Sequence, residues 1–449
     1  MRHSPARDPV PVSARTARAA ACAERLFRAA LEAVEAERAV LDSASLAERA
    51  LCGEPRPRRV IGLAIGKAAR PMARAIAAIC GERLDRGFAL VNEGYATGEP
   101  APGFDEHACG HPLPDARSVE ATRLVLDELA KSGSDTVLLA GLSGGGSAAL
   151  AAPAPGIPLE DKRALIARLL AAGAPIDELN AVRQHVSRVK GGRLARAAYP
   201  ARTVAWVISD VPGDRLDLIA SGPLSPAVAT WRLVARVLSE RLDGRAVPAS
   251  IARRVSEGLA GRIDDLPRES DPAFAPVAPW IVARPQDALE AAARAAERDG
   301  LAVHREPSTL TGEPAGEGRR LAERLLSLER PACLLAAGEL AGAPGLRPGR
   351  GGPCHEAALS AAEILAGHEG VVLLAADTDG IDGNAAGAGA IADGATLARA
   401  CARGLDAREH AVRHDAATFF EHAGGALHTG ATGTNVMQFF CGVALADRA

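Results

Sequence analysis

Aromatic side chains, paired cysteines, long apolar runs and an excess of basic residues are all missing from this sequence. Only 3% of the residues are aromatic, and the net charge is −3 with a pI near 6.4, so we expect no nucleic-acid partner. The eight cysteines include no C-x-x-C pair, which is typical of reduced thiols in a cytosol. No apolar run reaches about 18 residues, so we expect no membrane span and a cytoplasmic protein.

Apolar sequence is abundant, because 48% of the 449 residues are hydrophobic. Such a chain can bury more than one core usually holds, so we predict two α/β domains. The Arg-rich first twenty residues lack an apolar targeting segment, and we expect 1–20 to be a disordered extension. A Pro-rich stretch at 264–279 is the predicted connector between an N-terminal domain at 21–263 and a C-terminal domain at 280–445.

Strand and helix patterns alternate along the chain. This order predicts a mostly parallel, doubly wound, Rossmann-like sheet in the first domain, and the same alternation after residue 280 predicts a second α/β domain. The strands are expected at 60–65, at 86–91 and before Gly144, and the helices at 21–40, 67–80, 116–131 and over much of 225–261.

A glycine-rich turn lies within 137–150, where VLLAGLSGGGSAAL runs from an apolar strand through three glycines into a helix-forming stretch. Backbone N–H groups in such a turn can approach a phosphate at the positive end of a helix dipole, although a tight turn that binds nothing has the same pattern. Apolar runs also end in Gly, Asp or Lys within 60–69, 207–214 and 373–383. Because an open α/β sheet delivers its strand ends to one crevice, the sequence predicts one site there.

Two nucleotide-binding fingerprints nearly fit this sequence. The segment from Gly62 to Lys67 resembles a Walker A loop, but it is one spacer residue short and is followed by Ala68 in place of Ser or Thr. The glycines of the triple-glycine turn satisfy G-x-G-x-x-A, but the acids at 160–161 open a helix instead of ending a strand. A P-loop is therefore excluded, and a nicotinamide-dependent dehydrogenase stays open as an alternative.

Several longer motifs are spread along the chain. They are GHPLPD at 110–115, LSGGGSAAL at 142–150, LNAVRQHVSRVKGGRLA at 179–195, ISDVPGD and IASGP within 208–223, GRGG at 349–352, DTDGIDG at 377–383 and TGATGTNV at 429–436. Together they resemble one family, the bacterial glycerate 2-kinases that carry a C-terminal MOFRL domain and are often labelled hydroxypyruvate reductase. The resemblance covers about residues 21–441. It implies a phosphotransferase that moves the γ-phosphoryl group of ATP to the 2-hydroxyl of D-glycerate with Mg²⁺, in the cleft between the domains of a monomer or homodimer.

Phosphoryl transfer needs cations on the phosphates, carboxylates for Mg²⁺ and a group near the acceptor hydroxyl. Lys67 matches the family's catalytic lysine, and a cation in the first turn of a helix opposes the helix dipole, which indicates an anionic partner. Asp210 and Asp214 follow a strand and could hold Mg²⁺ or only shape a turn.

The resemblance and the residue patterns together give the full set of candidates. Helical spacing would place Arg183 and Ser187 on one face with Lys190 nearby, as a lining for an anionic substrate or as a solvated face. The candidates are Lys67, Arg350, Asp210 and Asp377 for catalysis; Ser143, Gly144, Gly145, Gly146, Ser147, Lys190, Gly433, Thr434 and Asn435 for the nucleotide; His111, Arg183 and Glu356 for the substrate; and Asp210, Asp214 and Asp379 for the metal.

One segment departs from the family pattern. Where the family usually continues its arginine loop as Gly-Arg-Asn-Gln-Glu, this chain has Gly352, Pro353, Cys354, His355 and Glu356. A proline offers neither the charge nor the N–H of the missing arginine. Three readings therefore stand: a kinase of glycerate or of a related short hydroxy acid, a nicotinamide-dependent hydroxypyruvate reductase, and a catalytically impaired member that only binds a ligand.

Overall fold

The computed structural model describes residues 12–242, 247–342 and 349–446. The chain forms two compact units, which are described separately. The N-terminal unit comprises Glu35–Ala283 together with Gly433–Asn435. The C-terminal unit comprises the described parts of Met1–Val34, Arg284–Thr432 and Val436–Ala449.

The N-terminal unit is built on a six-stranded sheet with the order β3-β2-β1-β4-β5-β6, in which all neighbours are parallel. This order is that of dinucleotide-binding folds, and the predicted fold class is confirmed. The sequence patterns missed the edge strand β3. The strands are β1 (Arg59–Gly66), β2 (Arg86–Asn92), β3 (Phe104–Cys109), β4 (Thr136–Leu142), β5 (Arg202–Ile208) and β6 (Val277–Ala283).

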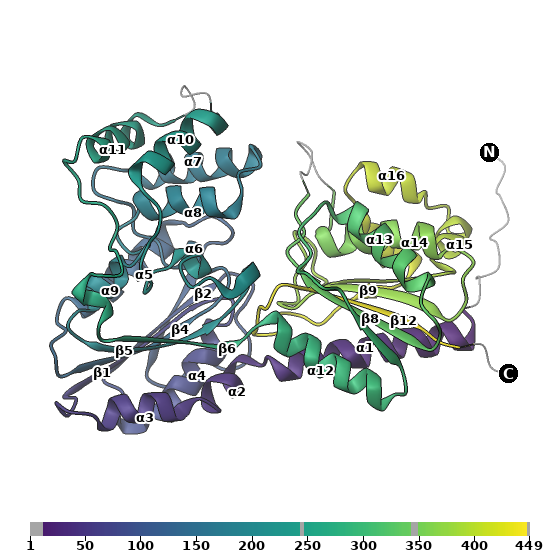
Figure 1. Ribbon diagram of the computed structural model, residues 1–449, viewed down its shortest axis with the longest axis horizontal. Coiled ribbons are helices and arrows are strands. Elements are labelled where there is room, and N and C mark those ends of the chain that lie inside the picture. Colours follow the sequence, from purple (N-terminus) through teal and green to yellow (C-terminus); the bar gives the residue numbers. More distant parts are fainter. Residues whose placement is uncertain (1–11, 243–246, 343–348, 447–449) are drawn as a thin grey trace. The chain divides into compact units, whose positions relative to one another are not determined.

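Helices cover both faces of this sheet, which explains why its central strands are apolar on both sides (Figure 1). Alternate residues of β1, such as Ile61, Leu63 and Ile65, pack in one apolar cluster with α5 and α9. One face carries α2 (Ala36–Leu41), α3 (Ala44–Cys52) and α4 (Ala69–Cys80), and the other carries α5 (Ala116–Leu129), α6 (Gly146–Ala149) and α9 (Arg193–Ala198).

A further layer of helices lies beyond α6 in the same unit (Figure 1). Its apolar cluster is distinct from that of the sheet and includes Leu165, Val182, Trp231 and Ile251. Part of the stretch 225–261 is helical, as predicted, although 225–230 is not. The helices of this layer are α7 (Leu159–Ala171), α8 (Ile176–His185), α10 (Trp231–Leu242) and α11 (Ala249–Leu259).

The C-terminal unit has a mixed sheet with the order β11-β10-β9-β12-β8-β7, in which only β7 and β8 are parallel neighbours. Helices α1 and α12 pack on one face, and α13 and α14 on the other (Figure 1). The elements are α1 (Ala14–Ala33), α12 (Pro285–Arg298), β7 (Ala302–Arg305), α13 (Pro314–Leu326), β8 (Ala332–Gly338), α14 (Pro353–Leu365), β9 (Val371–Asp377), β10 (Gly389–Asp393), α15 (Thr396–Ala402), α16 (Ala407–Val412), α17 (Ala416–Ala423), β11 (Ala426–Leu427) and β12 (Gln438–Ala444).

Helix α1 corrects the expected start of the first domain. Residues 1–11 lie outside the described part of the chain, but the rest of the expected extension is largely helical, because α1 begins at Ala14. The apolar stripe of α1 packs on the C-terminal sheet, where the Phe27 and Phe439 ring centroids are 5.5 Å apart. An amphipathic pattern predicts a buried face but not which of two sheets covers it, so α1 was assigned to the wrong unit.

The stretch 264–279 is a folded part of the N-terminal unit and not a connector. Arg268 donates a hydrogen bond to the Ala227 carbonyl and forms an ion pair with Asp265. The stretch then runs into the edge strand β6, which contains Pro279. Proline is tolerated in an edge strand because one side of such a strand has no neighbouring strand to bond with. The prolines of 264–279 therefore do not mark the boundary between domains that the sequence alone predicted.

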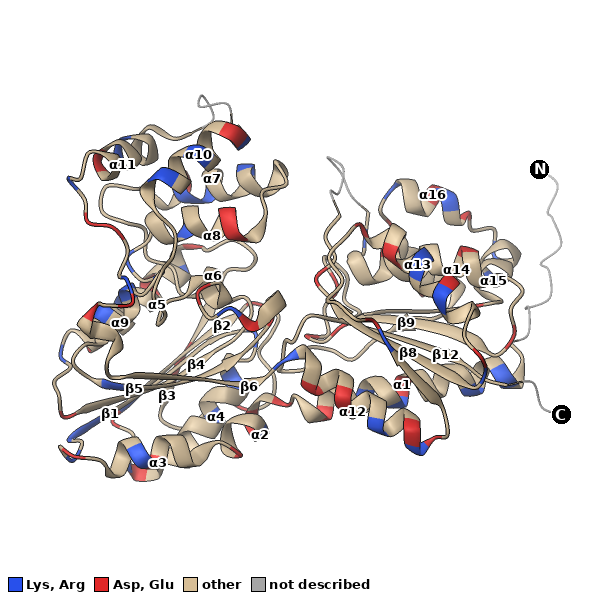
Figure 2. Cartoon of the chain, viewed as in Figure 1, with Lys and Arg blue, Asp and Glu red and all other residues tan. Residues whose placement is uncertain are grey.

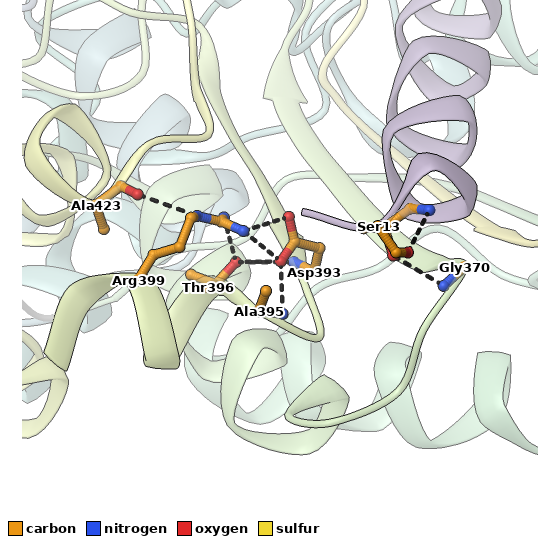
Figure 3. Close-up of polar contacts among 8 residues, drawn as sticks. Ser13, Gly370, Asp393, Ala395, Thr396, Arg399 and Ala423 are labelled. Carbon is orange, nitrogen blue, oxygen red and sulfur yellow. Dashed lines mark hydrogen bonds and ion pairs between the residues drawn. The ribbon is translucent and has the colours of Figure 1, made fainter. Parts of the chain in front are cut away.

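Buried polar contacts hold the end of β10 in the C-terminal unit. Figure 3 shows the Arg399 guanidinium between the Asp393 carboxylate, at 2.9 Å, and the Ala423 carbonyl, at 3.2 Å. Asp393 is buried and the Arg399 side chain is only 11% exposed, and Asp393 also accepts from the Ala395 N–H. Elsewhere, acidic and basic residues are interspersed along the helices of both units (Figure 2). No helix within the described ranges is long and apolar enough to cross a membrane.

Candidate active site

The loops after β1 and β4 meet at the carboxyl edge of the parallel sheet, where the strand order reverses. The Lys67 N–H donates to the Gly144 carbonyl at 2.8 Å, and the Ser143 N–H donates to the Ile65 carbonyl at 3.1 Å. Gly66 has φ +108°, and a Cβ there would lie 2.5 Å from the Gly144 oxygen. Only glycine permits this close approach of the two turns, which places the predicted glycine-rich turn at the usual ligand edge of such sheets.

Ser143 fastens the two turns to each other. Its buried hydroxyl donates to the Ile65 carbonyl and accepts from the Ala68 N–H, both at 3.0 Å. The helix that follows, α6, has only four residues, so the dipole that it offers to an anion is small. The observed contacts of Ser143 are therefore structural, and a direct contact with a nucleotide stays a prediction.

Lys67 lies beside a pair of aromatic rings at this edge. Its half-buried ammonium is 5.1 Å from the centroid of the Tyr95 ring, and Tyr95 meets the predicted substrate residue His111 edge-on at 5.8 Å. An aromatic face attracts a cation by about 0.5–2 kcal/mol, so Tyr95 helps to fix where the ammonium lies. Sequence reasoning missed Tyr95, because a lone aromatic residue in a loop carries no pattern.

Asn92, the last residue of β2, is a second residue that sequence reasoning missed. Its side chain is buried, its Nδ2 donates a long hydrogen bond of 3.4 Å to the Gly145 carbonyl, and its Oδ1 has no hydrogen-bond partner. A Cβ on Gly145 would collide with this oxygen and would lie 3.1 Å from Lys67 Cγ. A buried acceptor without a donor is costly, which makes this edge suited to a polar ligand. Its position at a strand end was the available signal.

Asp210 and Asn435 complete the site from two distant motifs. Asn435 Nδ2 lies 3.4 Å from Asp210 Oδ2, and a Cβ on Gly144 would collide with both side chains. Gly433 has φ +77°, and a Cβ there would lie 2.9 Å from Thr97 Oγ1. Residues 433–435, with Thr434 buried, thus belong to the N-terminal unit, although both neighbouring segments belong to the C-terminal unit.

A network of hydroxyl groups extends from the glycine-rich turn. Ser147 Oγ lies 2.8 Å from Ser221 Oγ, which donates to Asn180 Oδ1 at 2.7 Å. Ala220 and Ser221 have φ values of +50° and +64°, which are unfavourable for residues other than glycine. A strained backbone conformation persists only where the surrounding structure holds it in place, and such conformations are common at functional sites.

Lys190 is buried against the same turn. Its ammonium donates to the Ser147 carbonyl at 2.7 Å and to the Leu150 carbonyl at 3.2 Å. Burial, together with the nearby charges of Lys162 and Arg183, holds the pKa of Lys190 well below its usual range. Of the candidates named in the sequence, Lys67, the turn from Ser143 to Ser147, Lys190, Asp210 and Asn435 therefore gather at one edge of one unit.

The expected helix face in 179–195 is wrong. Helix α8 ends at His185, so Ser187 and Lys190 follow it in an irregular segment, and Ser187 Oγ donates to the Ala152 carbonyl at 3.3 Å. The half-buried Arg183 stays on α8, and burial lowers the pKa of its guanidinium to about 10. The helical pattern therefore stops at His185, and a separate short helix, α9, begins at Arg193 after two glycines with positive φ.

The expected metal residues lie in different parts of the fold. Asp214 is half-buried in a short 3₁₀ turn with φ +53°, next to Gly213, and thus shapes that turn. Asp379 is fully buried in the C-terminal unit and accepts from the Ile381 N–H at 2.8 Å, while Asp377 accepts from the Asp379 N–H at 3.1 Å. In the part of the chain that the structure describes, no three His, Cys, Asp or Glu side chains form a metal-binding group.

Arg350 is engaged by an acid of its own unit. It forms two hydrogen bonds of 2.7 Å with the Glu421 carboxylate, and this pairing raises the pKa of Arg350. Glu356 pairs with His414 at 2.7 Å and borders a cavity of about 360 Å³ beside Gly351 and Gly352. The Gly-, Pro- and Arg-rich sequence of 342–353 predicts a loop over a ligand, but its residues 343–348 lie outside the described part of the chain.

The residues that depart from the family pattern form the start of α14. Pro353 is the first residue of this helix, where a missing N–H costs nothing. Asp382 accepts from the Cys354 and His355 N–H groups at 3.1 and 2.8 Å and pairs with the His355 ring at 2.6 Å. The helix N-terminus that could have held a ligand anion therefore holds a carboxylate of the chain itself.

Comparisons with known proteins agree with this architecture. The family called DUF4147, a domain of unknown function, matches residues 22–256, and the MOFRL family matches residues 332–438. The chain is 35% identical to the D-glycerate 2-kinase of Thermotoga maritima over 86% of this chain and 90% of that protein. It is 36% identical to a putative hydroxypyruvate reductase of Agrobacterium vitis over 92% and 91% of the two chains.

A solved structure shares the fold as well. The crystal structure of a glycerate kinase from Thermotoga maritima superposes with a TM-score of 0.80 at 34% identity, covering 95% of this chain and 99% of that one. The order of the two matched domains is the order of the two units along most of the chain. The chain belongs to the glycerate kinase family, in which a DUF4147 domain precedes a MOFRL domain.

Proposed function

We propose that this protein is a kinase that transfers the γ-phosphoryl group of ATP, with Mg²⁺, to the 2-hydroxyl of D-glycerate or of a closely related short hydroxy acid. The names of its relatives, D-glycerate 2-kinase and glycerate kinase, support the reaction class. One observation carries the proposal: Lys67, Gly144, Asp210 and Asn435, from four separate motifs, meet at the carboxyl edge of the parallel sheet. Phosphoryl transfer depends on such positioned charges more than on covalent chemistry.

The residues at this edge fit the groups that the reaction needs. Lys67 would neutralise phosphate charge, with its ammonium held over Tyr95, and the backbone of the turn at 143–147 would lie against the phosphates. Asp210 offers the carboxylate oxygen that a hard cation prefers. Mg²⁺ usually binds one or two carboxylates together with substrate phosphates and waters, so a larger set of protein ligands is not required. When bound, the ion would offset charge on the transferring group.

For the C-terminal unit, we propose that Arg350 binds a phosphate or carboxylate and that Asp377 serves as a metal ligand or as the base for the acceptor hydroxyl. The Arg350 fork already binds a carboxylate in two-pronged geometry, that of Glu421, which is the geometry an oxyanion would take. Asp377 is half-buried at the carboxyl end of β9. Glu356 stays a candidate for the substrate beside the cavity at Gly351 and Gly352.

The deciding experiment supplies the purified protein with ATP, Mg²⁺ and D-glycerate, follows ADP release and separates 2-phosphoglycerate from 3-phosphoglycerate. We expect ADP and 2-phosphoglycerate in equal amounts. Formation of 3-phosphoglycerate would overturn the position of attack but not the reaction class. Absence of ADP release with D-glycerate and with other short 2-hydroxy acids would favour the impaired member that only binds a ligand.

A hydroxypyruvate reductase is the alternative, because the strand order is that of dinucleotide-binding folds and some relatives carry that name. In such folds an acid near the end of the second strand binds the ribose hydroxyls. Here β2 ends in the buried amide of Asn92, and the acid that follows it, the exposed Glu93, forms an ion pair with Arg117 at 2.7 Å. We therefore expect no NADH or NADPH oxidation with hydroxypyruvate, and clear oxidation in that assay would reverse the preference.

A further inference from the structure

Two of the chain's four lysines are buried in the N-terminal unit. Lys162, in the first turn of α7, is 2% exposed, and Lys190, after α8, is 1% exposed. The half-buried Arg183 of α8 lies near both, since its charge lowers the pKa of each lysine. We call Lys162, Arg183 and Lys190 the buried cation cluster.

The partners of this cluster are too few for its charge. Lys190 has two backbone carbonyls, but the Lys162 ammonium is buried and has no hydrogen-bond partner. Among the described residues, no carboxylate forms an ion pair with any member of the cluster. An ordered water could accept a hydrogen bond from Lys162, but it carries no negative charge to offset that of the buried ammonium.

The cluster adjoins the proposed active site through the glycine-rich turn. The carbonyl that Lys190 binds belongs to Ser147, whose hydroxyl contacts Ser221. Arg183 is half-buried and is thus the member of the cluster nearest to solvent, and a guanidinium can bind an oxyanion through two hydrogen bonds. Fixed cations beside a strained, hydroxyl-rich turn suit a small oxyanion.

We propose that the buried cation cluster binds an oxyanion group of a substrate, either the carboxylate of a short hydroxy acid or a phosphoryl group of a nucleotide. Lys162, which no sequence motif singled out, is the residue that specifies this site, because its ammonium has no structural partner to satisfy. The inference deepens the proposed function by adding a contact for one of its substrates, and it rests on that function only for the choice of substrates to test.

Because Lys162 is buried, its replacement distinguishes a structural role from a ligand-binding role. Removing a structural ion pair destabilises a protein, whereas removing an unpaired buried charge stabilises it. In the full-length protein without ligand, Lys162→Met should therefore raise the midpoint of thermal unfolding by a few degrees. Lys131→Met is the matched control, because Lys131 is exposed and pairs only with Glu128, and its midpoint should stay unchanged.

Binding is measured as the rise of that midpoint during titration with inorganic phosphate, D-glycerate or ADP, with chloride at equal ionic strength as the control. At least one of these should stabilise the wild-type protein, and its apparent Kd should weaken at least tenfold in Lys162→Met but not in Lys131→Met. The affected compound separates the two sources: D-glycerate indicates the carboxylate, and phosphate or ADP indicates the phosphoryl group.

Two results would overturn the inference: an equal response of Lys162→Met and the wild type to every anion, or a lower midpoint of the free Lys162→Met protein, which would assign Lys162 a structural role. The kinase assay keeps the two proposals separate. If anions stabilise the wild type through Lys162 but no phosphoryl transfer occurs, the proposed function fails and the site stands. If transfer occurs and Lys162→Met leaves KM and kcat unchanged, the site fails and the function stands.

Discussion

All neighbouring strands of the N-terminal sheet run in one direction, whereas all but one neighbouring pair in the C-terminal sheet run in opposite directions. The carboxyl ends of all strands of the parallel sheet lie at a single edge. There the turns that carry Lys67, Gly144 and Asp210 contact one another. The mixed sheet divides its strand ends between two edges. Its charged candidates are engaged locally, Arg350 by Glu421 and Glu356 by His414. A parallel sheet with a reversal in strand order therefore collects functional groups that a mixed sheet leaves dispersed.

The largest expected effect tests whether the carboxyl edge of the parallel sheet is the site of phosphoryl transfer. Lys67→Ala should lower phosphoryl transfer on the order of 10²-fold or more, since a preorganised charge contact in an active site is worth that much. The half-buried side chain contributes little to packing, so thermal unfolding should be unchanged. ADP release measures the activity, and Lys131→Ala, at an exposed residue just beyond the end of α5, is the control. Undiminished turnover in Lys67→Ala would remove the main support for the comparison.

Asp210 tests whether the same edge holds the metal. Asp210→Asn keeps the volume but removes the negative charge that Mg²⁺ prefers, so the Mg²⁺ concentration at half-maximal rate should rise roughly tenfold or more. The KM for D-glycerate should change less. Asp264→Asn, at an exposed position of the same unit, is the control and should leave both values unchanged. If only the KM for D-glycerate rises, the carboxylate faces the substrate instead; if neither value changes, the Asp210 loop is a turn alone.

The sequence predicted more of the parallel sheet and its candidate site than of the C-terminal unit. Motifs at strand ends predicted the parallel sheet, its ligand edge and most of the residues there, because strand order converts sequence motifs into neighbours. Tyr95 was missed because a lone aromatic residue in a loop carries no pattern. Asn92 was missed although its position at the end of β2 was a usable signal. The placement of α1 was wrong because its apolar stripe fits either sheet. The Arg350–Glu421 pair joins residues far apart in the sequence, so no local pattern could predict it.

In the C-terminal unit, the ion pair between Arg399 and Asp393 is expected to contribute to stability and not to activity. Arg399 and Asp393 form a buried ion pair near the end of β10, and breaking such a pair by removing one partner costs about 3 kcal/mol or more. Arg399→Met should therefore lower the midpoint of urea unfolding clearly while leaving the activity of the remaining folded protein unchanged. Arg403→Met, at the exposed residue that follows α15, is the control. Loss of activity without loss of stability would contradict a structural role.

Lys162 should also make stability depend on pH in the N-terminal unit. Burial, with the charge of Arg183, lowers the pKa of Lys162 to about 7 from its usual value of 10.5. Between these two values the unfolded chain binds more protons than the folded one, so stability should rise with pH from about 7 towards 10. Unfolding midpoints at pH 7 and pH 9 should differ less in Lys162→Met than in the wild type. Arg183 and the buried Lys190 remain in both proteins, so an unchanged difference would assign the pH dependence to them.

The smallest expected effect concerns the comparison itself, namely whether the Arg350–Glu421 pair is only a resting contact. Both side chains are partly exposed, so Arg350 can leave Glu421 at little cost. If Arg350 binds a substrate oxyanion, Glu421 competes with that anion. Glu421→Gln should then lower the KM for D-glycerate or ATP a few-fold at low salt, and added salt should reduce the difference. Glu409→Gln, which alters an exposed pair with Arg413, controls for the change in net charge. Arg350→Lys should act in the opposite direction, because a single ammonium cannot reproduce the two-pronged contact. If Glu421→Gln leaves every KM unchanged and Arg350→Lys is as active as the wild type, the pair is structural, and the anion-binding residues of this protein lie in the N-terminal unit alone.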